Sequence, residues 1–293
     1  MDGRNEAAAR GEAPDRTQDQ SDFAARLASL PASRLTAALG PLVTALQDLI
    51  RKVALTPAEF ATALDYLTEV GHYSDARRQE WVLLADALGL SALVEDLSSP
   101  RPAGATPNTV AGPFYRADVP DRAFGATTSL DGKGVPLEVR GQVTSLDGTP
   151  VGGALVEVWQ ANGHGKYENQ EPDHQPENNL RGRFHTDAQG RFAFASVMPG
   201  GYALPSDGPV GRLLTVLGLC LERPAHLHFR VSAPGYQRLT TQIFDRADPA
   251  IGRDAVFAVK PELLADFVAV HLPGGQGARS LDLTLVLCPV RQG

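Results

Sequence analysis

The pattern of apolar and polar residues changes once along this chain, near residue 100. Before that point glycine is scarce and apolar residues recur at helical spacing, as at Leu42, Leu46 and Leu49, which predicts amphipathic helices. Thr56 and Glu59 have the spacing of a capping box, with Pro57 between them at the first helical position, and predict a second helix start. We expect helices over the segment around 42–50, from 57 to just before Gly71, from about 75 to 89, and over 92–97.

After residue 100 the chain breaks into short segments rich in β-favouring residues. Turn signals such as Asp147-Gly148 and Pro234-Gly235 separate them. No stretch between them has the helical period that a parallel βαβ unit needs, so the pattern favours an antiparallel β-sandwich. The expected strands are 137–143, 154–160, 182–187, 192–197, 226–232, 239–244 and 281–287.

The predicted fold is therefore mainly β with an α-helical N-terminal unit. Residues 1–20 are polar and charged and are expected to form a disordered tail. A helical unit is expected over 21–100 and a sandwich domain over 101–293. The run 168–177 is rich in Glu, Asp and Gln and is expected to be a solvated loop.

Composition narrows the range of partners. The chain has 27 Lys and Arg against 34 Asp and Glu, a net charge of −7, which argues against nucleic-acid binding. No apolar run approaches the ~18–20 residues of a membrane span, and the first residues lack a signal-peptide pattern, so the cytoplasm is the expected compartment. The two cysteines are too few for a disulfide framework or a thiolate metal site.

The most informative pair of residues is His226 and His228. In a strand, alternate side chains share a face, so both imidazoles point one way while Leu227, Phe229 and Val231 point to the core. Two neutral imidazoles at this spacing suit a metal ion. Two histidines on a solvated strand face are the other interpretation.

The remaining donors leave the kind of metal open. Glu222 could complete a ferrous triad of two histidines and a carboxylate. Tyr167 and Tyr202 each follow a glycine turn at a strand end, where a large polar ring can project into a cleft. They could equally be ordinary core or rim tyrosines. A tyrosinate is a hard anionic ligand that favours ferric iron.

Several segments together resemble the intradiol ring-cleaving dioxygenases, in the group of catechol, chlorocatechol and hydroxyquinol 1,2-dioxygenases. The resemblance covers about 42–287 and is most specific in five segments, 112–115 (GPFY), 156–162 (VEVWQAN), 179–184 (NLRGRF), 223–229 (RPAHLHF) and 239–244 (LTTQIF). It implies one Fe(III) per subunit held by Tyr167, Tyr202, His226 and His228. The implied reaction inserts both atoms of O₂ between the two hydroxylated carbons of a catechol-type ring.

The resemblance also implies roles around the iron. Tyr202 would leave the metal and accept a proton from the diol, Arg223 would stabilise developing negative charge, and Gln242 would orient a reacting group. An ion pair of Arg223 with Glu222 at the surface is the alternative for that arginine. The implied substrate-binding residues are Leu83, Asp86, Gly112, Pro113, Phe114, Leu204, Pro205 and Arg223.

The diol is less well defined. Asp86, in the segment 83–89 (LLADALG), could accept a hydrogen bond from a third ring hydroxyl, and the run after Tyr202 resembles that of hydroxyquinol enzymes except at Ala203. Asp86 could also be a plain solvent-facing acid. The expected substrate is hydroxyquinol, cleaved to maleylacetate. The alternative is catechol or chlorocatechol, cleaved to a cis,cis-muconate.

The resemblance further implies that the helical unit joins two subunits in a homodimer. A phospholipid or fatty acid could lie in its groove, with Leu46, Ile50, Leu64 and Leu67 as lining residues. Two other functions compete. One is a transthyretin-like binding sandwich that has lost the metal, and the other is a ferrous extradiol-type enzyme that uses Glu222.

Overall fold

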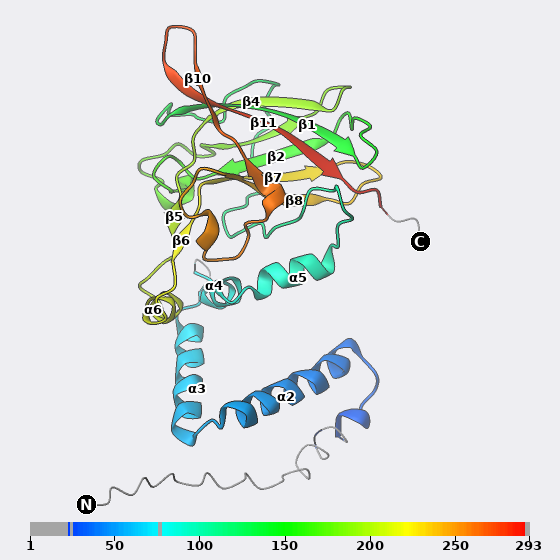
Figure 1. Cartoon of the computed structure of the whole chain (residues 1–293), viewed down its shortest axis with the longest axis vertical. Coiled ribbons are helices and arrows are strands. Elements are labelled where there is room, and N and C mark those ends of the chain that lie inside the picture. The colour runs from blue at the N-terminus through cyan, green and yellow to red at the C-terminus, as the bar shows by residue number, and fades with distance from the viewer. Residues whose placement is uncertain (1–22, 24–25, 76–77, 291–293) are drawn as a thin grey trace, which may run out of the picture. The chain divides into compact units, whose positions relative to one another are not determined.

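The computed structural model describes residues 23, 26–75 and 78–290 (Figure 1). The expected disordered tail, 1–20, lies outside the described residues. The chain divides into two compact units, Met1–Leu67 and Thr68–Gly293. This boundary does not coincide with the change from helix to strand, which comes after Ser98. The helices α4 and α5 belong to the second unit, where α4 packs against α5 and α6.

The first unit contains α2 (Arg34–Val53) and most of α3 (Pro57–His72). The predicted capping box is confirmed: the Thr56 amide donates to Glu59 Oε2 at 2.9 Å, and the Glu59 amide donates to Thr56 Oγ1 at 3.3 Å. The helix that it opens ends at His72, not before Gly71 as expected. No described side chain of α2 is buried.

The second unit begins with the end of α3 and continues with α4 (Glu80–Ala87) and α5 (Leu90–Ser98). The expected helix start at residue 75 is wrong. Asp75 instead closes a turn, in which its amide donates to the Arg78 carbonyl at 2.7 Å and its Oδ1 accepts from the Arg78 amide at 2.8 Å. Gly89, with a φ of +72°, separates α4 from α5.

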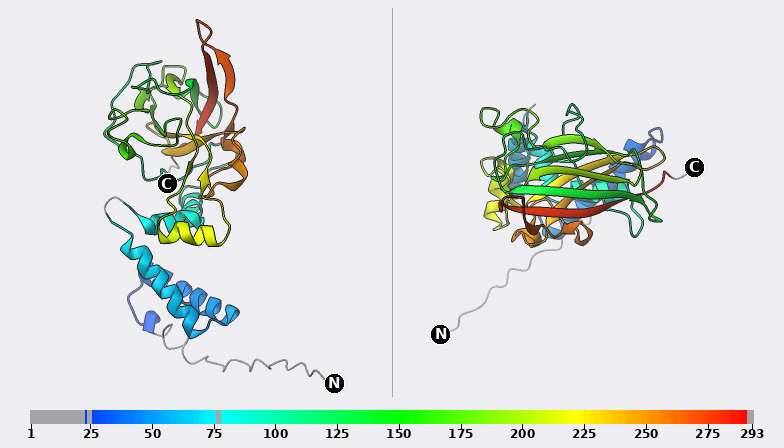
Figure 2. Two further views of the ribbon diagram at one scale, coloured as in Figure 1. Left: turned by 90° about the vertical axis from the view of Figure 1, so that its left-hand side faces the viewer. Right: turned by 90° about the horizontal axis from the view of Figure 1, so that it is seen from above.

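Two stacked sheets form the sandwich (Figures 1 and 2). The first sheet has the order β10 (Val268–His271), β11 (Gly277–Leu287), β1 (Pro136–Ser145) and β4 (Arg191–Val197). The second has the order β3 (Arg181–His185), β2 (Leu155–Gln160), β7 (His226–Ser232), β8 (Leu239–Asp245) and β9 (Leu264–Ala265). A separate short pair joins β5 (Tyr202–Ala203) to β6 (Glu222–Arg223).

The core lies between the two sheets. As predicted, Leu227, Phe229 and Val231 of β7 are buried. The Phe229 ring packs against those of Phe192 and Phe194 of the facing sheet, with ring centres 6.1 and 6.4 Å apart. This packing directs the other face of β7, which carries His226 and His228, away from the core and toward the site.

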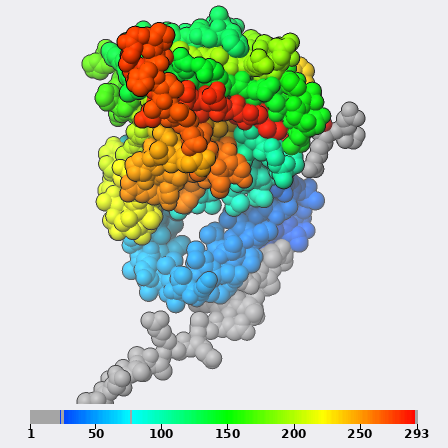
Figure 3. All heavy atoms as spheres, turned by 45° about the horizontal axis from the view of Figure 1, so that its top comes forward, coloured from blue at the N-terminus to red at the C-terminus, as the bar shows by residue number. Residues whose placement is uncertain are grey.

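All seven expected strands are present, and the largest difference is at β11, which begins at Gly277. Two pairings depart from the antiparallel expectation. β8 and the short β9 run parallel, and β1 and β11 run parallel from Leu137↔Arg279 to Ser145↔Leu287. The strands β1 and β11 lie side by side in the view from above (Figure 2), and in the space-filling view β11 crosses the surface as a red band (Figure 3). The sequence pattern did not predict α6 (Pro209–Val216) or the short strands β5, β6, β9 and β10.

Short 3₁₀ turns, η1 (Glu168–Gln170), η2 (Ile251–Arg253) and η3 (Pro261–Leu263), occur in the connections. Among the described residues, every helix is too short or too polar to cross a membrane.

Candidate functional site: a cluster of two tyrosines and two histidines

The site is built on one row of side chains that crosses four strands of the second sheet. Cross-strand pairing places Arg181 of β3 opposite Trp159 of β2, Trp159 opposite His228 of β7, and His228 opposite Gln242 of β8. Directly paired residues share a face of a sheet. His226, two residues before His228, therefore lies on this face as well.

Both histidines are buried, each with 2% of its surface exposed, so the alternative of a solvated strand face is wrong. His226 Nδ1 lies 2.7 Å from the Pro224 carbonyl oxygen, which identifies Nδ1 as the donor and leaves a lone pair on Nε2. The two Nε2 atoms lie 3.2 Å apart. The Trp159 ring stacks on His228, with centres 4.6 Å apart, and sets the plane of that imidazole.

The environment keeps these imidazoles neutral. Burial, followed by the positive charge of Arg223, holds the pKa of His226 well below its usual value. Burial and then the neighbouring His226 do the same to the pKa of His228. Neutral imidazole is the form that binds a metal ion.

The two tyrosines are brought together by the glycine turns before them. A Cβ atom on Gly165 would meet the Gly201 carbonyl oxygen at 2.4 Å, and one on Gly200 would meet the Gly163 carbonyl oxygen at 2.5 Å. Only glycine allows the two loops to approach so closely. As a result the rings of Tyr167 and Tyr202 meet edge to face with centres 6.1 Å apart.

Tyr167 is almost completely buried, with 1% of its surface exposed. Its ring stacks on Phe114 at 4.1 Å between centres, and its hydroxyl has no hydrogen-bond partner among the described residues. Burial, followed by the charge of the neighbouring Tyr202, raises the pKa of the Tyr167 phenol well above its usual value. A buried hydroxyl without a partner is rare in folded proteins and marks this position as unusual.

Tyr202 lies on β5, opposite Arg223 of β6. Arg223 Nη1 donates to the Tyr202 hydroxyl oxygen at 3.3 Å, and the Tyr202 ring centre lies 5.8 Å from that of His226. Tyr202 thus has a positively charged partner at its oxygen, whereas Tyr167 has none there.

Arg223 is buried and makes three directed contacts. Its Nε donates to Asp254 Oδ1 at 3.1 Å, and its Nη2 donates to Gln242 Oε1 at 2.8 Å. Gln242 Nε2 in turn donates to the Val110 carbonyl at 3.0 Å, which orients the amide. The alternative for Arg223, a surface pair with Glu222, is wrong.

Glu222 is exposed to solvent. Its carboxylate is 54% exposed and pairs with Arg253 at 3.0 Å. Within 23, 26–75 and 78–290, no three residues among His, Cys, Asp and Glu come together in a way that could hold a metal ion. The alternative of a ferrous site completed by Glu222 is therefore wrong.

The cluster fits a metal ion by its chemistry. It offers two imidazole nitrogens and two phenol oxygens, and the Tyr167 oxygen is buried with no hydrogen-bond partner in the part of the chain that the structure describes. Anionic oxygen donors of this kind suit a hard, highly charged ion. The fold and the donors together define the class: a β-sandwich protein with a cluster suited to one metal ion at one face of a sheet.

Two of the predicted substrate residues, Gly112 and Phe114, lie beside this cluster. A Cβ on Gly112 would lie 3.7 Å from His228 Cε1, and Phe114 packs on Tyr167. Leu204 is buried, and Leu83 is half-buried on α4. Pro113 and Pro205 are exposed.

Asp86 of α4 is partly buried, and its carboxylate feels the charge of Arg223. Burial raises the pKa of this carboxyl, while a hydrogen bond with the Ser91 side chain opposes that rise. Asp86 is therefore not a plain solvent-facing acid.

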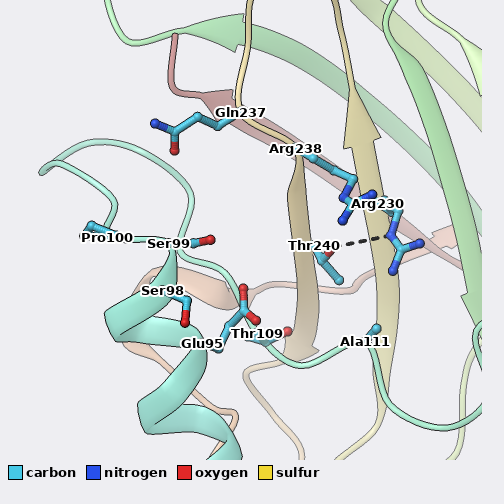
Figure 4. Close-up of a pocket in the computed structure, with 10 residues that line it drawn as sticks. All are labelled: Glu95, Ser98, Ser99, Pro100, Thr109, Ala111, Arg230, Gln237, Arg238 and Thr240. Carbon is cyan, nitrogen blue, oxygen red and sulfur yellow. Dashed lines mark hydrogen bonds between the residues drawn. The ribbon is translucent and has the colours of Figure 1, made fainter. Parts of the chain in front are cut away.

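A pocket of about 620 Å³ lies farther along the same face of the sheet (Figure 4). Arg230 and Thr240, the next residues along β7 and β8 on this face, line it together with Glu95 of α5. None of the four donors and none of the predicted substrate residues lines this pocket. Its wall carries charges of both signs, with Arg230 and Arg238 on one side and Glu95 on another, so it defines no single class of ligand.

Several contributors could not be read from the sequence. Asp254, which holds Arg223, belongs to no motif, and Val110 acts through its carbonyl. The expectation that 168–177 is a solvated loop is wrong at two positions. Gln175 is buried, and Glu168 is buried and pairs with the buried Arg181 at 2.7 Å. In the sequence, the position of Glu168 directly after Tyr167 was the indication that it could be buried.

Comparison with known proteins agrees with this class. The family described as "Dioxygenase" matches residues 110–288, and "Catechol dioxygenase N terminus" matches 32–106. The chain is 45% identical to a hydroxyquinol 1,2-dioxygenase of Rhizobium sp. (strain MTP-10005) over 84% of both chains. It is 42% identical to a 6-chlorohydroxyquinol 1,2-dioxygenase of Cupriavidus pinatubonensis over 90% of this chain and 94% of the relative.

Solved structures of dioxygenases are also similar to this chain. A hydroxyquinol 1,2-dioxygenase of Pseudomonas putida DLL-E4 is 36% identical, with a TM-score of 0.88 over 93% of this chain and 98% of that chain. A catechol 1,2-dioxygenase of Pseudomonas arvilla C-1 is 31% identical, with a TM-score of 0.78 over 94% and 93%. The chain belongs to the intradiol ring-cleavage dioxygenase family, whose members use non-haem iron.

Proposed function

We propose that this protein holds one ferric ion between Tyr167, Tyr202, His226 and His228 and cleaves hydroxyquinol between its two adjacent hydroxylated carbons. The observation that carries the proposal is the meeting of these four donors in one cluster beside Arg223, with Tyr202 partly buried and the other three buried. The neutral state of both imidazoles and the unpartnered Tyr167 oxygen support it. A transthyretin-like sandwich without a metal is not favoured, because all four donors are present.

When bound there, a ferric ion would supply Lewis acidity that eases the loss of protons from the diol. The residues of the chain have distinct tasks. Tyr202 Oη would accept a proton from the substrate, and Arg223 Nη1, which donates to that oxygen, fixes its position. Arg223 also offers positive charge where negative charge develops on the substrate. Gln242, held by Arg223 and the Val110 carbonyl, presents a fixed amide to the reacting carbons.

Hydroxyquinol is the preferred substrate on two grounds. Relatives named as hydroxyquinol or chlorohydroxyquinol dioxygenases are 45% and 42% identical over most of the chain. Asp86 is a partly buried carboxylate in the field of Arg223, where it can accept a hydrogen bond from the third ring hydroxyl. The product would be maleylacetate. Catechol or chlorocatechol, giving a cis,cis-muconate, is the alternative.

The test is turnover of hydroxyquinol, catechol and 4-chlorocatechol by iron-loaded protein, with product analysis and a visible spectrum. We expect one iron per chain, a tyrosinate-to-iron absorption band, and the highest kcat/KM for hydroxyquinol. A colourless protein with full iron content would contradict the ligand set. A yellow semialdehyde product would contradict intradiol cleavage, and a clear preference for catechol would contradict the substrate.

Asp86→Ala tests the substrate assignment directly. A hydrogen bond to a charged group contributes about 1.5–3 kcal/mol, so the kcat/KM ratio of hydroxyquinol over catechol should fall by about ten- to a hundredfold. Activity with catechol, which lacks the third hydroxyl, should change little. Asp282→Ala, at an exposed position on β11, is the control and should leave the ratio unchanged. An unchanged ratio in Asp86→Ala would remove Asp86 from substrate recognition.

We also propose that residues 101–293 form the catalytic domain and that the helices within 21–100 join two subunits. The apolar side chains of α2 and α3 support this, since Leu42, Leu46 and Leu49 are all more than half exposed. A phospholipid or fatty acid could occupy the same apolar surface, beside Ile50, Leu64 and Leu67, which are 40%, 48% and 39% exposed.

A further inference from the structure

A buried ion pair lies directly beside Tyr167. Arg181, the first residue of β3, has no exposed surface, and its Nε donates to Glu168 Oε1 at 2.7 Å. Glu168 is the residue after Tyr167 and is only 3% exposed. Burying two charges is costly, and such a pair is often no more stable than apolar residues would be. Its presence at this point calls for a reason other than stability.

Arg181 contacts two residues next to Tyr167, Glu168 and Phe114, and also lies near the Tyr167 ring. Its Nη1 donates to the carbonyl oxygen of Phe114, the residue whose ring stacks on Tyr167. Its guanidinium carbon lies 5.8 Å from the centre of the Tyr167 ring. Through Glu168 and Phe114, one side chain therefore fixes the backbone next to Tyr167 and the ring that packs on it.

Glu168 lies between two arginines in the surroundings of Tyr167. Glu168 pairs with Arg181 and, at 3.4 Å, with Arg116. Arg116 in turn faces two exposed carboxylates, those of Asp118 at 3.0 Å and Glu177 at 3.3 Å. The two exposed carboxylates balance the charge of Arg116, which is itself 27% exposed, so the buried ion pair beside Tyr167 is that of Arg181 with Glu168.

We propose that Arg181 is a positioning residue for Tyr167, and that its charge, moderated by Glu168, sets the electron donation of that phenolate to the iron. The inference rests on the proposed function, because it takes Tyr167 to be an iron ligand. Arg223 stands in a similar relation to Tyr202, at 5.9 Å from the ring centre. A buried arginine thus lies near the ring of each tyrosine, and the charge of Arg223 also acts on Tyr167.

The two members of the ion pair should act in opposite directions. A positive charge beside a phenolate lowers the energy of its electrons, so more energy is needed to move one to the metal. Arg181→Met should therefore shift the tyrosinate-to-iron absorption band to longer wavelength. Glu168→Gln keeps the shape of the side chain but leaves Arg181 less compensated, and should shift the band to shorter wavelength. A purely structural role would make both variants change in the same way, because both break the same ion pair.

The experiment uses the iron-loaded full chain and compares wild type, Arg181→Met, Arg181→Lys and Glu168→Gln by visible spectrum and by iron release to a chelator. Iron release to the chelator confirms that each spectrum comes from iron-loaded protein. Arg181→Lys keeps the charge and should largely restore the band position. Arg183→Met is the matched control, since Arg183 lies on the same face of β3, two residues further, and pairs with Asp121. Its band should not move.

Opposite shifts in Arg181→Met and Glu168→Gln would support the proposal. Shifts in one direction, or none, with iron bound would overturn it. If Arg181→Met does not fold, the near-isosteric Glu168→Gln still decides, because an unmoved band in that variant contradicts the inference. A wild-type protein that binds iron without any visible band would instead contradict the proposed ligand set, so the two failures are distinguishable.

Discussion

At the scale of single residues, Tyr167 is the most unusual feature of the site. A folded protein places a buried hydroxyl where it can make a hydrogen bond, since leaving it unpartnered costs about 1–3 kcal/mol. The Tyr167 oxygen has no such partner among the described residues, although the centre of the Tyr202 ring lies 6.1 Å from that of Tyr167. Binding of a metal ion by this oxygen would satisfy the group.

This leads to a prediction for Tyr167→Phe. In the metal-free protein the variant should be at least as stable as wild type, by up to about 1–3 kcal/mol, because it removes an unsatisfied group and keeps the ring stacked on Phe114. In the iron-loaded protein it should lose the visible band. Chemical denaturation without metal and a spectrum with metal give the two measurements.

Tyr115→Phe is the matched control for stability. The Tyr115 hydroxyl donates to Glu157 Oε1 at 3.0 Å, so its removal should destabilise the metal-free protein by about 1 kcal/mol. Loss of stability in both variants to the same extent would show that the Tyr167 hydroxyl has a partner in solution. A retained visible band in Tyr167→Phe would exclude this residue as a ligand.

At the scale of elements, β-favouring residues and turn signals were enough to locate all seven long strands. Those signals depend only on residues close in sequence. The pattern did not predict β5 and β6, because two-residue strands carry no periodicity, nor α6, whose eight residues begin at Pro209 within a run dominated by turn formers. The parallel pairing of β1 with β11 joins segments about 140 residues apart, and no local signal specifies it.

The residues of the candidate site also divide into those that local sequence predicted and those that it did not. His226 and His228 could be read from alternation along one strand, and the two tyrosines from the glycine turns beside them. The partners that hold these groups could not, because they come from distant segments: Asp254 reaches Arg223, and Arg181 reaches Glu168. The polar residues around Glu168 in the sequence predicted an exposed loop, but Glu168 is buried and pairs with Arg181.

Gly141 of β1 gives a prediction at this scale. It pairs with Phe192 of β4, and a Cβ at this position would lie 2.1 Å from Phe192 Cζ, so the ring lies across the space that a side chain would fill. Gly141→Ala should destabilise the sandwich by about 1–3 kcal/mol through overpacking, measured by chemical denaturation. Gly277→Ala, on β11 with no atom within 4 Å of the added Cβ, is the control. Equal stability of the Gly141 variant and wild type would mean that the Phe192 ring moves freely aside.

At the scale of the whole molecule, the two units differ in how they bury apolar surface. The sandwich unit has a core of fully buried phenylalanines and leucines between its sheets. In the first unit, α2 has no buried residue, although several leucines recur along it. A helix with an apolar stripe gains most of its stability from burying that stripe against another element. The exposed stripe therefore points to a second surface that covers it, which we take to be a second copy of the chain.

Leu46→Asp tests this arrangement. A charge placed within a buried apolar interface costs far more than one on a free surface, so the variant should sediment at the 31.1 kDa mass of one chain, whereas wild type should sediment at twice that mass. Thr44→Asp adds the same charge at an exposed position on the other side of α2 and should leave the wild-type mass unchanged. Because the proposed iron ligands lie in the sandwich unit, the monomeric variant should keep its iron and visible band. A wild-type protein that sediments as a single chain would contradict the homodimer, and the apolar stripe would then need a different occupant, such as the proposed lipid.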